Sequence, residues 1–164
     1  MNRLLADFTM FLARNDDSLQ FLPLTEARLD EVLRVEQQAH DHPWTRRHFA
    51  DTLVASYQGQ LLCSADDILG YFVAMRGVDE VHLLNITVAT GYQRQGWGRM
   101  LLDALVIWAR AQGAQWLWLE ARVSNLRALH VYESFGLKRV GERKNYYPAA
   151  LGRREHAVVM SLKL

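Results

Sequence analysis

A run of branched apolar residues that passes directly into a glycine-containing turn and a helix is the feature that most constrains this fold. The run from Val81 to Val88 shows no alternation of polar and apolar residues, which indicates a central strand covered on both faces. The chain then turns through Gly91 and Gly96, and apolar residues recur at helical spacing from Gly98 to Ala111 until Gly113 stops the pattern. A buried strand that feeds a helix requires helices packed on both sides of a sheet.

The rest of the chain continues this succession of strands and helices. Strands are predicted over residues 19–24, 60–64, 68–75, 116–121, 137–147 and 155–163, and helices over residues 26–39, 45–54 and 125–135. The last two strands would form a long terminal hairpin. The whole pattern predicts an α/β fold, a mixed sheet of about six to seven strands with about four helices on both faces. We expect the chemistry at the carboxyl ends of the central strands.

Capping residues give the ends of the two helices in the first half of the chain. Thr25 is predicted to cap the helix that begins at Glu26. Thr45 is predicted to cap the next helix, and Gly59 marks its exit.

Composition and charge exclude several classes of protein. The chain has 164 residues, of which 50% are hydrophobic, and we assign residues 19–164 to one domain and residues 1–18 to an N-terminal extension. Nineteen basic residues against eighteen acidic ones give no broad basic field, so direct nucleic-acid binding is not expected. No apolar run approaches the roughly twenty residues that span a bilayer, so no membrane contact is expected.

The cysteine and histidine content argues against disulfides and metals. The single cysteine, Cys63, excludes an internal disulfide and fits a cytoplasmic protein, and its simplest interpretation is a small buried residue in a strand. His40, His42 and His48 lie near one another in sequence. No cysteine or carboxylate set at ligand spacing accompanies them, so surface or capping histidines are the simpler interpretation and no metal is predicted.

The glycine turn after the central strand is a candidate phosphate site. Free backbone N–H groups converge where a helix begins, and such a cluster attracts phosphate. Gly96 and Gly98 leave room for a pyrophosphate near the backbone, while Arg94 and Arg99 add positive charge. A tight strand-to-helix turn without a ligand would have a similar sequence, so the pattern alone leaves both interpretations open.

Two familiar nucleotide motifs are excluded by the residues at one or two of their positions. Trp97 and Gly98 stand where a P-loop needs Lys and Ser or Thr, so hydrolysis of a nucleoside triphosphate is not expected. Leu101 occupies the third glycine position of a dinucleotide fingerprint, so a nicotinamide cofactor is not expected either.

The pattern Gln93-x-x-Gly96-x-Gly98 after an apolar strand resembles the pyrophosphate motif of the GNAT superfamily of acetyl-CoA-dependent N-acetyltransferases. The stretches NITV (85–88), YQRQGWGRMLL (92–102), WLEARVSNLRALHVYESFGL (118–137) and RKNYYP (143–148) are similar to the RimI-type ribosomal-protein alanine N-acetyltransferases. The resemblance covers residues 19 to the end and is strongest from residue 81 onward. It does not extend to the residues before Ser18.

This resemblance implies a GNAT fold with a splayed pair of central strands and acetyl-CoA as cosubstrate, without a metal. The pantetheine arm would lie between the strands and pair with the backbone around Ile86, Thr87 and Val88. One of these N–H groups could polarise the thioester carbonyl. Asn125 would donate or accept a hydrogen bond to the cofactor, although it is also a candidate helix N-cap. The backbone N–H groups that would hold the pyrophosphate belong to Arg94, Gln95, Gly96, Trp97, Gly98 and Arg99.

Two residues are candidates for the acid and the base of acetyl transfer. The resemblance implies Glu120 as the general base and Tyr132 as the general acid that protonates the CoA thiolate. Alternation along the strand places Trp116, Trp118 and Glu120 on one face, where apolar neighbours would favour a carboxylate acting as a base. Without the resemblance, Glu120 could simply pair with Arg122 or Arg127, and Tyr132 could be a core aromatic. No base is recognisable near Cys63, so direct transfer is favoured over a covalent intermediate.

The resemblance also implies where the acceptor amine binds. The loop at His42-Pro43-Trp44-Thr45 and the segment Asn145-Tyr146-Tyr147-Pro148 would form the walls, with Trp44, Tyr146 and Tyr147 as substrate-binding residues. Adjacent tyrosines could instead serve hairpin packing. The implied acceptor is the N-terminal alanine of the eighteenth small-subunit ribosomal protein. Alternatives left open are a lysine, polyamine or aminoglycoside acceptor, a non-catalytic acetyl-CoA-binding module, and a scaffold whose turn only packs.

Overall fold

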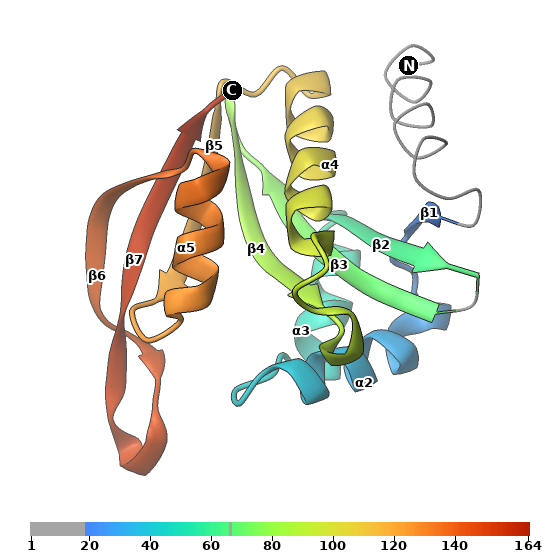
Figure 1. Cartoon of the computed structure of the whole chain (residues 1–164), viewed down its shortest axis with the longest axis horizontal. Helices are drawn as coiled ribbons and strands as arrows, with labels where there is room; N and C mark the ends of the chain where they lie inside the picture. Colours follow the sequence, from blue (N-terminus) through green and yellow to red (C-terminus); the bar gives the residue numbers. More distant parts are fainter. Residues whose placement is uncertain (1–18, 66) are drawn as a thin grey trace.

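The computed structural model describes residues 19–65 and 67–164, and these residues form one seven-stranded sheet with helices on both faces (Figure 1). The predicted extension over residues 1–18 lies outside the described residues. The strand order is β1-β2-β3-β4-β5-β7-β6. The strands are β1 (Leu19–Pro23), β2 (Gln58–Ser64), β3 (Asp67–Arg76), β4 (Glu80–Val88), β5 (Trp116–Arg122), β6 (Lys138–Pro148) and β7 (Arg154–Lys163).

Four α-helices and three short 3-10 turns connect the described strands. The helices are α2 (Leu29–Ala39), α3 (Arg46–Val54), α4 (Trp97–Ala111) and α5 (Leu126–Phe135), and the 3-10 turns are η1 (Glu26–Arg28), η2 (Thr90–Tyr92) and η3 (Ala150–Gly152). The predicted mixed α/β class, with helices on both faces, is therefore confirmed.

The core lies in two layers that are separated by the sheet, and β3 contributes to both. Tyr71 and Val73 point to the layer formed with α2 and α3, whereas Phe72 and Ala74 point to the layer formed with α4 and α5. This alternation follows from the two-residue period of a strand. Because β3 is covered on both faces, it and its neighbour β4 are held firmly at the centre of the molecule.

The two central parallel strands, β4 and β5, pair over only part of their length. Their pairing runs from Glu80 opposite Trp116 to Leu83 opposite Leu119. Beyond this point β4 continues along β3 and β5 continues along β7, so the two strands separate, as Figure 1 shows. A bulge at Leu84 in the β3–β4 ladder marks the same place and increases the local bend. The predicted splayed pair is thus confirmed.

Two local predictions in the first half differ from the structure. Residues Glu26–Arg28 form a 3-10 turn before α2, and the Thr25 side chain makes no capping hydrogen bond there. Gly59 lies inside β2, where an added Cβ would come within 2.8 Å of the Leu24 Cβ. A glycine is required at position 59 by this close packing and not by a helix end. The residue in the left-handed conformation after α3 is instead Ser56, with φ of 56°.

The cap at Thr45 is confirmed. Its side chain accepts a hydrogen bond from the His48 N–H, and the Thr45 N–H donates to His48 Nδ1 at 3.0 Å, which completes a capping box. This reciprocal pair fixes the direction in which the chain leaves the 41–44 loop.

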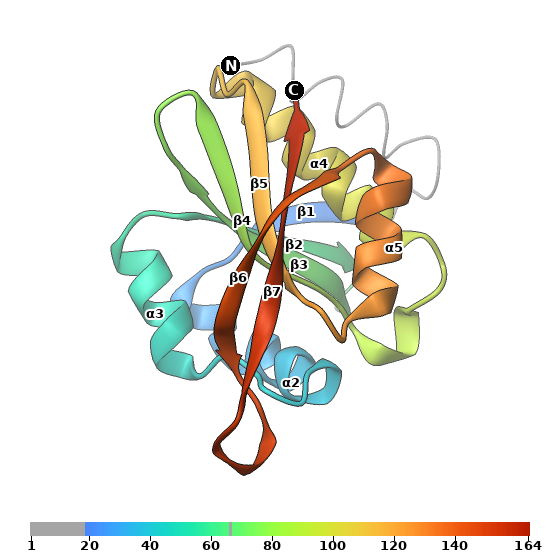
Figure 2. The same ribbon diagram turned by 90° about the vertical axis from the view of Figure 1, so that its left-hand side faces the viewer.

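The predicted terminal hairpin of β6 and β7 is also confirmed, and Figure 2 shows this end of the sheet nearest the viewer. The ladder of β6 shifts register twice, between Arg139 and Gly141 and between Arg143 and Tyr147. β6 forms one edge of the sheet and is exposed along almost its whole length. Within the described part of the chain, no helix is long and apolar enough to cross a membrane.

Candidate active site

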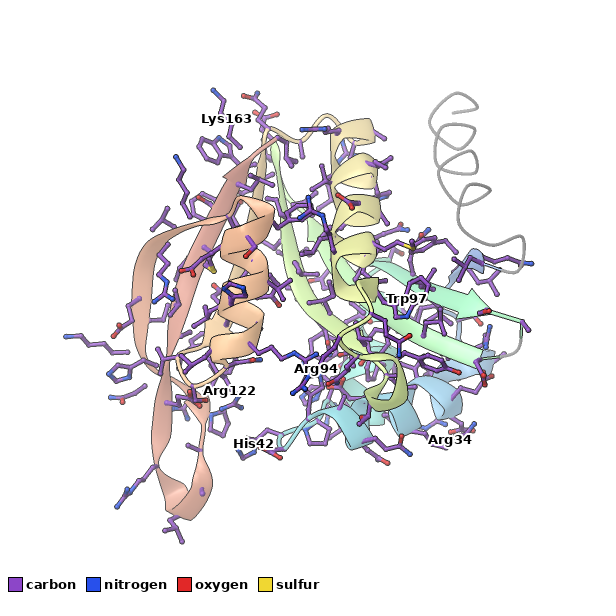
Figure 3. The ribbon with its side chains drawn as sticks, in the orientation of Figure 1. Arg34, His42, Arg94, Trp97, Arg122 and Lys163 are labelled. Atoms are coloured by element: carbon purple, nitrogen blue, oxygen red, sulfur yellow. The ribbon has the colours of Figure 1, made fainter. Side chains whose placement is uncertain are left out.

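Two adjoining cavities occupy the region where β4 and β5 separate. The larger has a volume of about 620 Å³ and the smaller about 360 Å³. Four residues line both cavities: His40, Ile86, Asn125 and Tyr132. Figure 3 shows three labelled residues around this region from three different segments, with His42 and Arg122 at the larger cavity and Arg94 at the smaller.

The smaller cavity contains almost all of the residues predicted to hold the cofactor. The predicted residues that line it are Ile86, Thr87, Val88, Arg94, Gly96, Trp97, Gly98, Arg99 and Asn125. Gln95 does not line it. Its amide nitrogen donates to the Gly91 carbonyl at 3.3 Å and its side-chain oxygen accepts from Trp97 Nε1 at 3.3 Å, so this side chain stiffens the turn from outside.

The backbone of the turn explains its two glycines differently. Gly96 has φ of 93°, a left-handed conformation, and directly precedes α4. Gly98 does not have this constraint, and an added Cβ would lie 3.7 Å from Val88, an ordinary contact. The protein alone therefore requires glycine at 96 but not at 98, whose missing side chain keeps the helix N-terminus open to a ligand.

Gln93, the first residue of the predicted pyrophosphate motif, connects three segments around the smaller cavity. Its amide nitrogen donates to the Val88 carbonyl at 3.1 Å, and its side-chain oxygen accepts from Arg127 Nη1 at 2.8 Å. The end of β4, the turn and α5 are thereby tied together at the cavity rim. Arg127 also lines this cavity and adds a third guanidinium to Arg94 and Arg99.

Glu120 lines the larger cavity, and its side chain is 21% exposed. It shares a face of β5 with Trp116 and Trp118, as alternation predicts, but this is the more open face of the strand. The carboxylate forms an ion pair with Arg143 Nε at 3.0 Å. A pairing with Arg122 or Arg127, which the sequence left open, is wrong because Arg122 pairs with Glu155 and Arg127 bonds Gln93.

Tyr132 lies where the two cavities meet. Burial raises the pKa of its hydroxyl well above the usual range, and nearby Tyr147 adds to the shift. The hydroxyl therefore stays protonated at neutral pH and can act as a proton donor. Asn125 is the N-cap of α5, since its side-chain oxygen accepts from the Ala128 N–H at 3.1 Å, and it also lines both cavities. The two interpretations of Asn125 are thus compatible.

Of the three residues predicted to bind substrate, two line the larger cavity. Trp44 and Tyr147 form part of its wall, whereas Tyr146 is 40% exposed and packs edge-on against Tyr147 at 5.0 Å between ring centroids. The Tyr147 hydroxyl donates to the Glu120 carbonyl at 3.1 Å, and Arg122 lies over its ring. Burial and the Glu120 carboxylate raise the pKa of Tyr147 to about 12.

Glu36 is the functional candidate that sequence reasoning missed. It lines the larger cavity although only 2% of it is exposed, and it accepts hydrogen bonds from several elements. The signal was present in the sequence, because Leu29, Val32 and Glu36 are spaced three and four residues apart and so share the buried face of α2. The sequence indicated only a surface or capping role for His40. Its Nε2 lies 2.8 Å from Thr87 Oγ1.

No group of three or more His, Cys, Asp or Glu suited to a metal ion occurs among residues 19–65 and 67–164. Cys63 is buried in the layer beneath α2, where its sulfur accepts from Arg28 Nη1 at 3.6 Å. It lines neither cavity, so this thiol is not part of the site.

Comparison with known proteins agrees with this geometry. The Acetyltransferase (GNAT) family matches residues 17–137. The chain belongs to this family. It is 38% identical over 136 residues to the [ribosomal protein bS18]-alanine N-acetyltransferase of Escherichia coli K12, a match that covers 83% of this chain and 91% of the relative.

Two solved structures extend the comparison. The crystal structure of the ribosomal-protein-S18-alanine N-acetyltransferase from Escherichia coli has a TM-score of 0.81 and 36% identity, and the match covers 88% of this chain and 93% of that one. A GNAT family acetyltransferase from Elizabethkingia anophelis, crystallised with acetyl-CoA bound, has a TM-score of 0.73 at 21% identity, with 91% of this chain and all of that chain covered (100%). The second match supports the fold alone.

Proposed function

We propose that this protein transfers the acetyl group of acetyl-CoA to a protein N-terminal α-amine, the N-terminal alanine of ribosomal protein bS18. The observation that carries the proposal is the pair of adjoining cavities, which share Tyr132 while Glu120 lines one and the glycine turn lines the other. The names of the relatives support the acceptor. In this proposal residues 19–164 form one acetyltransferase domain, and the ribosomal acceptor implies a cytoplasmic reaction.

The smaller cavity fits acetyl-CoA. The N-terminus of α4 offers backbone N–H groups, Arg94, Arg99 and Arg127 offer positive charge for phosphates, and an added Cβ at Gly98 would narrow the approach. The stretch of β4 beyond Leu83 has no pairing with β5, which leaves backbone groups on that side for an extended ligand arm. When bound, acetyl-CoA supplies the activated acetyl group.

The larger cavity fits the N-terminus of a peptide. Its walls combine Trp44, Tyr147 and Pro148, which offer apolar surface, with Asn85 and Glu120, which offer polar groups. An α-amine has an ordinary pKa near 8, against about 10.4 for a lysine, so it loses its proton more readily to a carboxylate. This difference favours an N-terminal over a lysine acceptor.

In the proposed reaction Glu120 accepts a proton from the amine, directly or through water. The Glu120 carboxylate lines the larger cavity, with one oxygen 3.0 Å from Arg143 Nε and a side chain that is 21% exposed, so an amine in this cavity can approach it. Tyr132 then donates its hydroxyl proton to the departing thiolate. Since Cys63 lies outside both cavities, we propose direct transfer to the amine, with no covalent enzyme intermediate.

A competition assay tests the acceptor. The protein is incubated with acetyl-CoA and an equimolar mixture of an alanine-starting bS18 peptide, the same peptide with a blocked N-terminus and an internal lysine, spermidine and an aminoglycoside, and the products are identified by mass spectrometry. We expect the alanine-starting peptide to be acetylated first and at its α-amine. Preference for another amine would show that the proposed acceptor is wrong, although the protein would still be an acetyltransferase. Binding of acetyl-CoA without any transfer would indicate a non-catalytic module.

A further inference from the structure

Glu36 is an almost fully buried carboxylate at the wall of the proposed acceptor cavity, surrounded by hydrogen-bond donors. Its Oε1 accepts from the backbone N–H of Trp44 at 2.8 Å and from Asn85 Nδ2 at 3.3 Å. Its Oε2 accepts from the Tyr71 hydroxyl and lies 3.2 Å from Thr87 Oγ1. Burying a charge is costly unless it is fully hydrogen-bonded, and here the donors compensate that cost.

These donors come from segments that contribute to different parts of the site. Trp44 belongs to the 41–44 loop of the larger cavity, whereas Asn85 and Thr87 lie on β4 in the stretch that has left β5. Because this stretch is paired with only one neighbouring strand, its position depends on β3 and on the carboxylate. His40 Nε2, 3.4 Å from Glu36 Oε2, extends the network to a residue that lines both cavities.

We propose that Glu36 is a positioning residue, which fixes the unpaired stretch of β4 and the 41–44 loop relative to each other so that the acceptor amine and the acetyl group are aligned. The inference rests on the proposed function, because it concerns the geometry of that transfer. It adds a residue of α2 to those already proposed to take part in the transfer.

Direct proton transfer is not assigned to Glu36 because its oxygen atoms are already occupied. A carboxylate has about four lone-pair sites, and four donors lie around this one. The side chain is also only 2% exposed, so an incoming amine would have to displace internal donors to reach it. Glu120, in contrast, lines the same cavity with a side chain that is 21% exposed.

The partners of the two oxygens predict how substitutions should behave. Oε1 faces N–H donors, whereas Oε2 faces the hydroxyls of Tyr71 and Thr87, which can accept as well as donate. A glutamine at this position can therefore direct its oxygen to the N–H groups and its NH₂ to the hydroxyls. Glu36→Gln should preserve the links without the charge, while Glu36→Ala removes both.

The test compares kcat, KM and acetyl-CoA affinity in the full chain, with the concentration of folded protein determined by circular dichroism. We expect Glu36→Ala to lower kcat on the order of 100-fold, as a misplacement of about 1 Å does, with a smaller effect on acetyl-CoA affinity. Glu36→Gln should restore most of the lost kcat. Thr52→Val is the control, because it removes a buried hydrogen bond to the Phe49 carbonyl that lies within α3 and outside both cavities, and it should lower Tm while kcat stays near wild type.

Thr87→Val keeps the experiment decisive if Glu36→Ala does not fold. This change keeps the shape of the side chain but removes the Thr87 hydroxyl, which contacts Glu36, Asn85 and His40, and we expect it to lower kcat with little change in Tm. If Glu36→Gln is as inactive as Glu36→Ala, the negative charge is what matters and positioning is wrong. If folded Glu36→Ala and folded Thr87→Val both keep the wild-type kcat, Glu36 contributes to stability only and the positioning role is wrong. A wild-type protein that acetylates none of the amines overturns the proposed function itself.

Discussion

The two adjoining cavities are built in different ways. The smaller one is formed largely by one continuous stretch, from Ile86 to Arg99, and the groups it offers to a ligand are mostly backbone N–H groups at a helix start and guanidinium groups. The larger one is formed by side chains from α2, the 41–44 loop, β4, β5 and the end of β6. Changes in the first should therefore act mainly on affinity for acetyl-CoA, and changes in the second mainly on turnover and on the acceptor.

The largest loss of kcat is expected for a change at Glu120, and it would test the contrast between the two cavities. Glu120→Gln keeps the shape of the side chain but removes the base, and general-base catalysis is worth about 10²- to 10⁴-fold in kcat. Acetyl-CoA affinity, measured by calorimetry, should change little because Glu120 does not line the smaller cavity. Glu142→Gln, on the exposed edge strand, is the control and should behave as wild type. A wild-type kcat in Glu120→Gln would mean that Glu120 is not the general base.

A smaller loss is expected at Tyr132, which belongs to both cavities. Tyr132→Phe should lower kcat by about 10- to 100-fold, because the thiolate must then leave without a positioned proton donor. Since burial raises the pKa of Tyr132, the wild-type hydroxyl stays protonated up to high pH and should cause no alkaline fall in kcat below about pH 9. Tyr57→Phe, outside both cavities, should leave kcat unchanged. Equal rates for all three proteins would contradict the acid role.

The glycine turn allows affinity and stability to be separated. Gly98→Ala should weaken acetyl-CoA binding by about tenfold, or about 1.4 kcal/mol, with little change in Tm, because the new Cβ is tolerated by the protein but faces the ligand. Gly96→Ala should also lower stability by about 1–2 kcal/mol, because it places a side chain at φ of 93°. Gly91→Ala, where an added Cβ meets nothing within 4 Å, is the control. Unchanged affinity in Gly98→Ala would argue against a pyrophosphate at this helix start.

The smallest effect concerns the pH dependence of stability at Tyr147. The pKa of this hydroxyl is raised to about 12 in the folded protein, whereas an unfolded tyrosine titrates near 10. The protonated Tyr147 hydroxyl therefore makes its full contribution to the free energy of unfolding below about pH 10, and this contribution is lost as pH rises from about 10 to about 12. Urea unfolding at pH 9, 10 and 11 should show a steeper fall for wild type than for Tyr147→Phe. Parallel curves would mean that Tyr147 is open to solvent in the folded state.

Much of the fold could be predicted because it depends on local patterns. The run from Val81 to Val88 and the helix that begins beyond Gly96 are continuous in sequence, and each is decided by burial periodicity and backbone conformation. Gly59 shows the limit of this approach. Its role depends on contact with Leu24, which directly follows β1, and only the pairing of β1 with β2 brings the two residues together.

The side-chain site was harder to predict for the same reason. Glu36 falls on the buried face of α2, but its burial is tolerable only because donors arrive from β3, β4 and the 41–44 loop. The partner of Glu120 is also non-local. Arg143 reaches it from β6, on the far side of β7, and this contact depends on the strand order β5-β7-β6 and on the register of the hairpin.

The edge position of β6 has a consequence for how the protein behaves at high concentration. An edge strand carries unpaired N–H and C=O groups that could add a strand from another molecule and begin aggregation. Here the edge is protected by Lys138, Arg139, Arg143 and Lys144, and by the two register shifts that bend it. Arg143 also pairs with Glu120, so it contributes both to the charge of the exposed edge and to the surroundings of the proposed base. Replacing basic residues of β6 by apolar ones would therefore favour self-association, and at Arg143 it would also remove the ion-pair partner of Glu120.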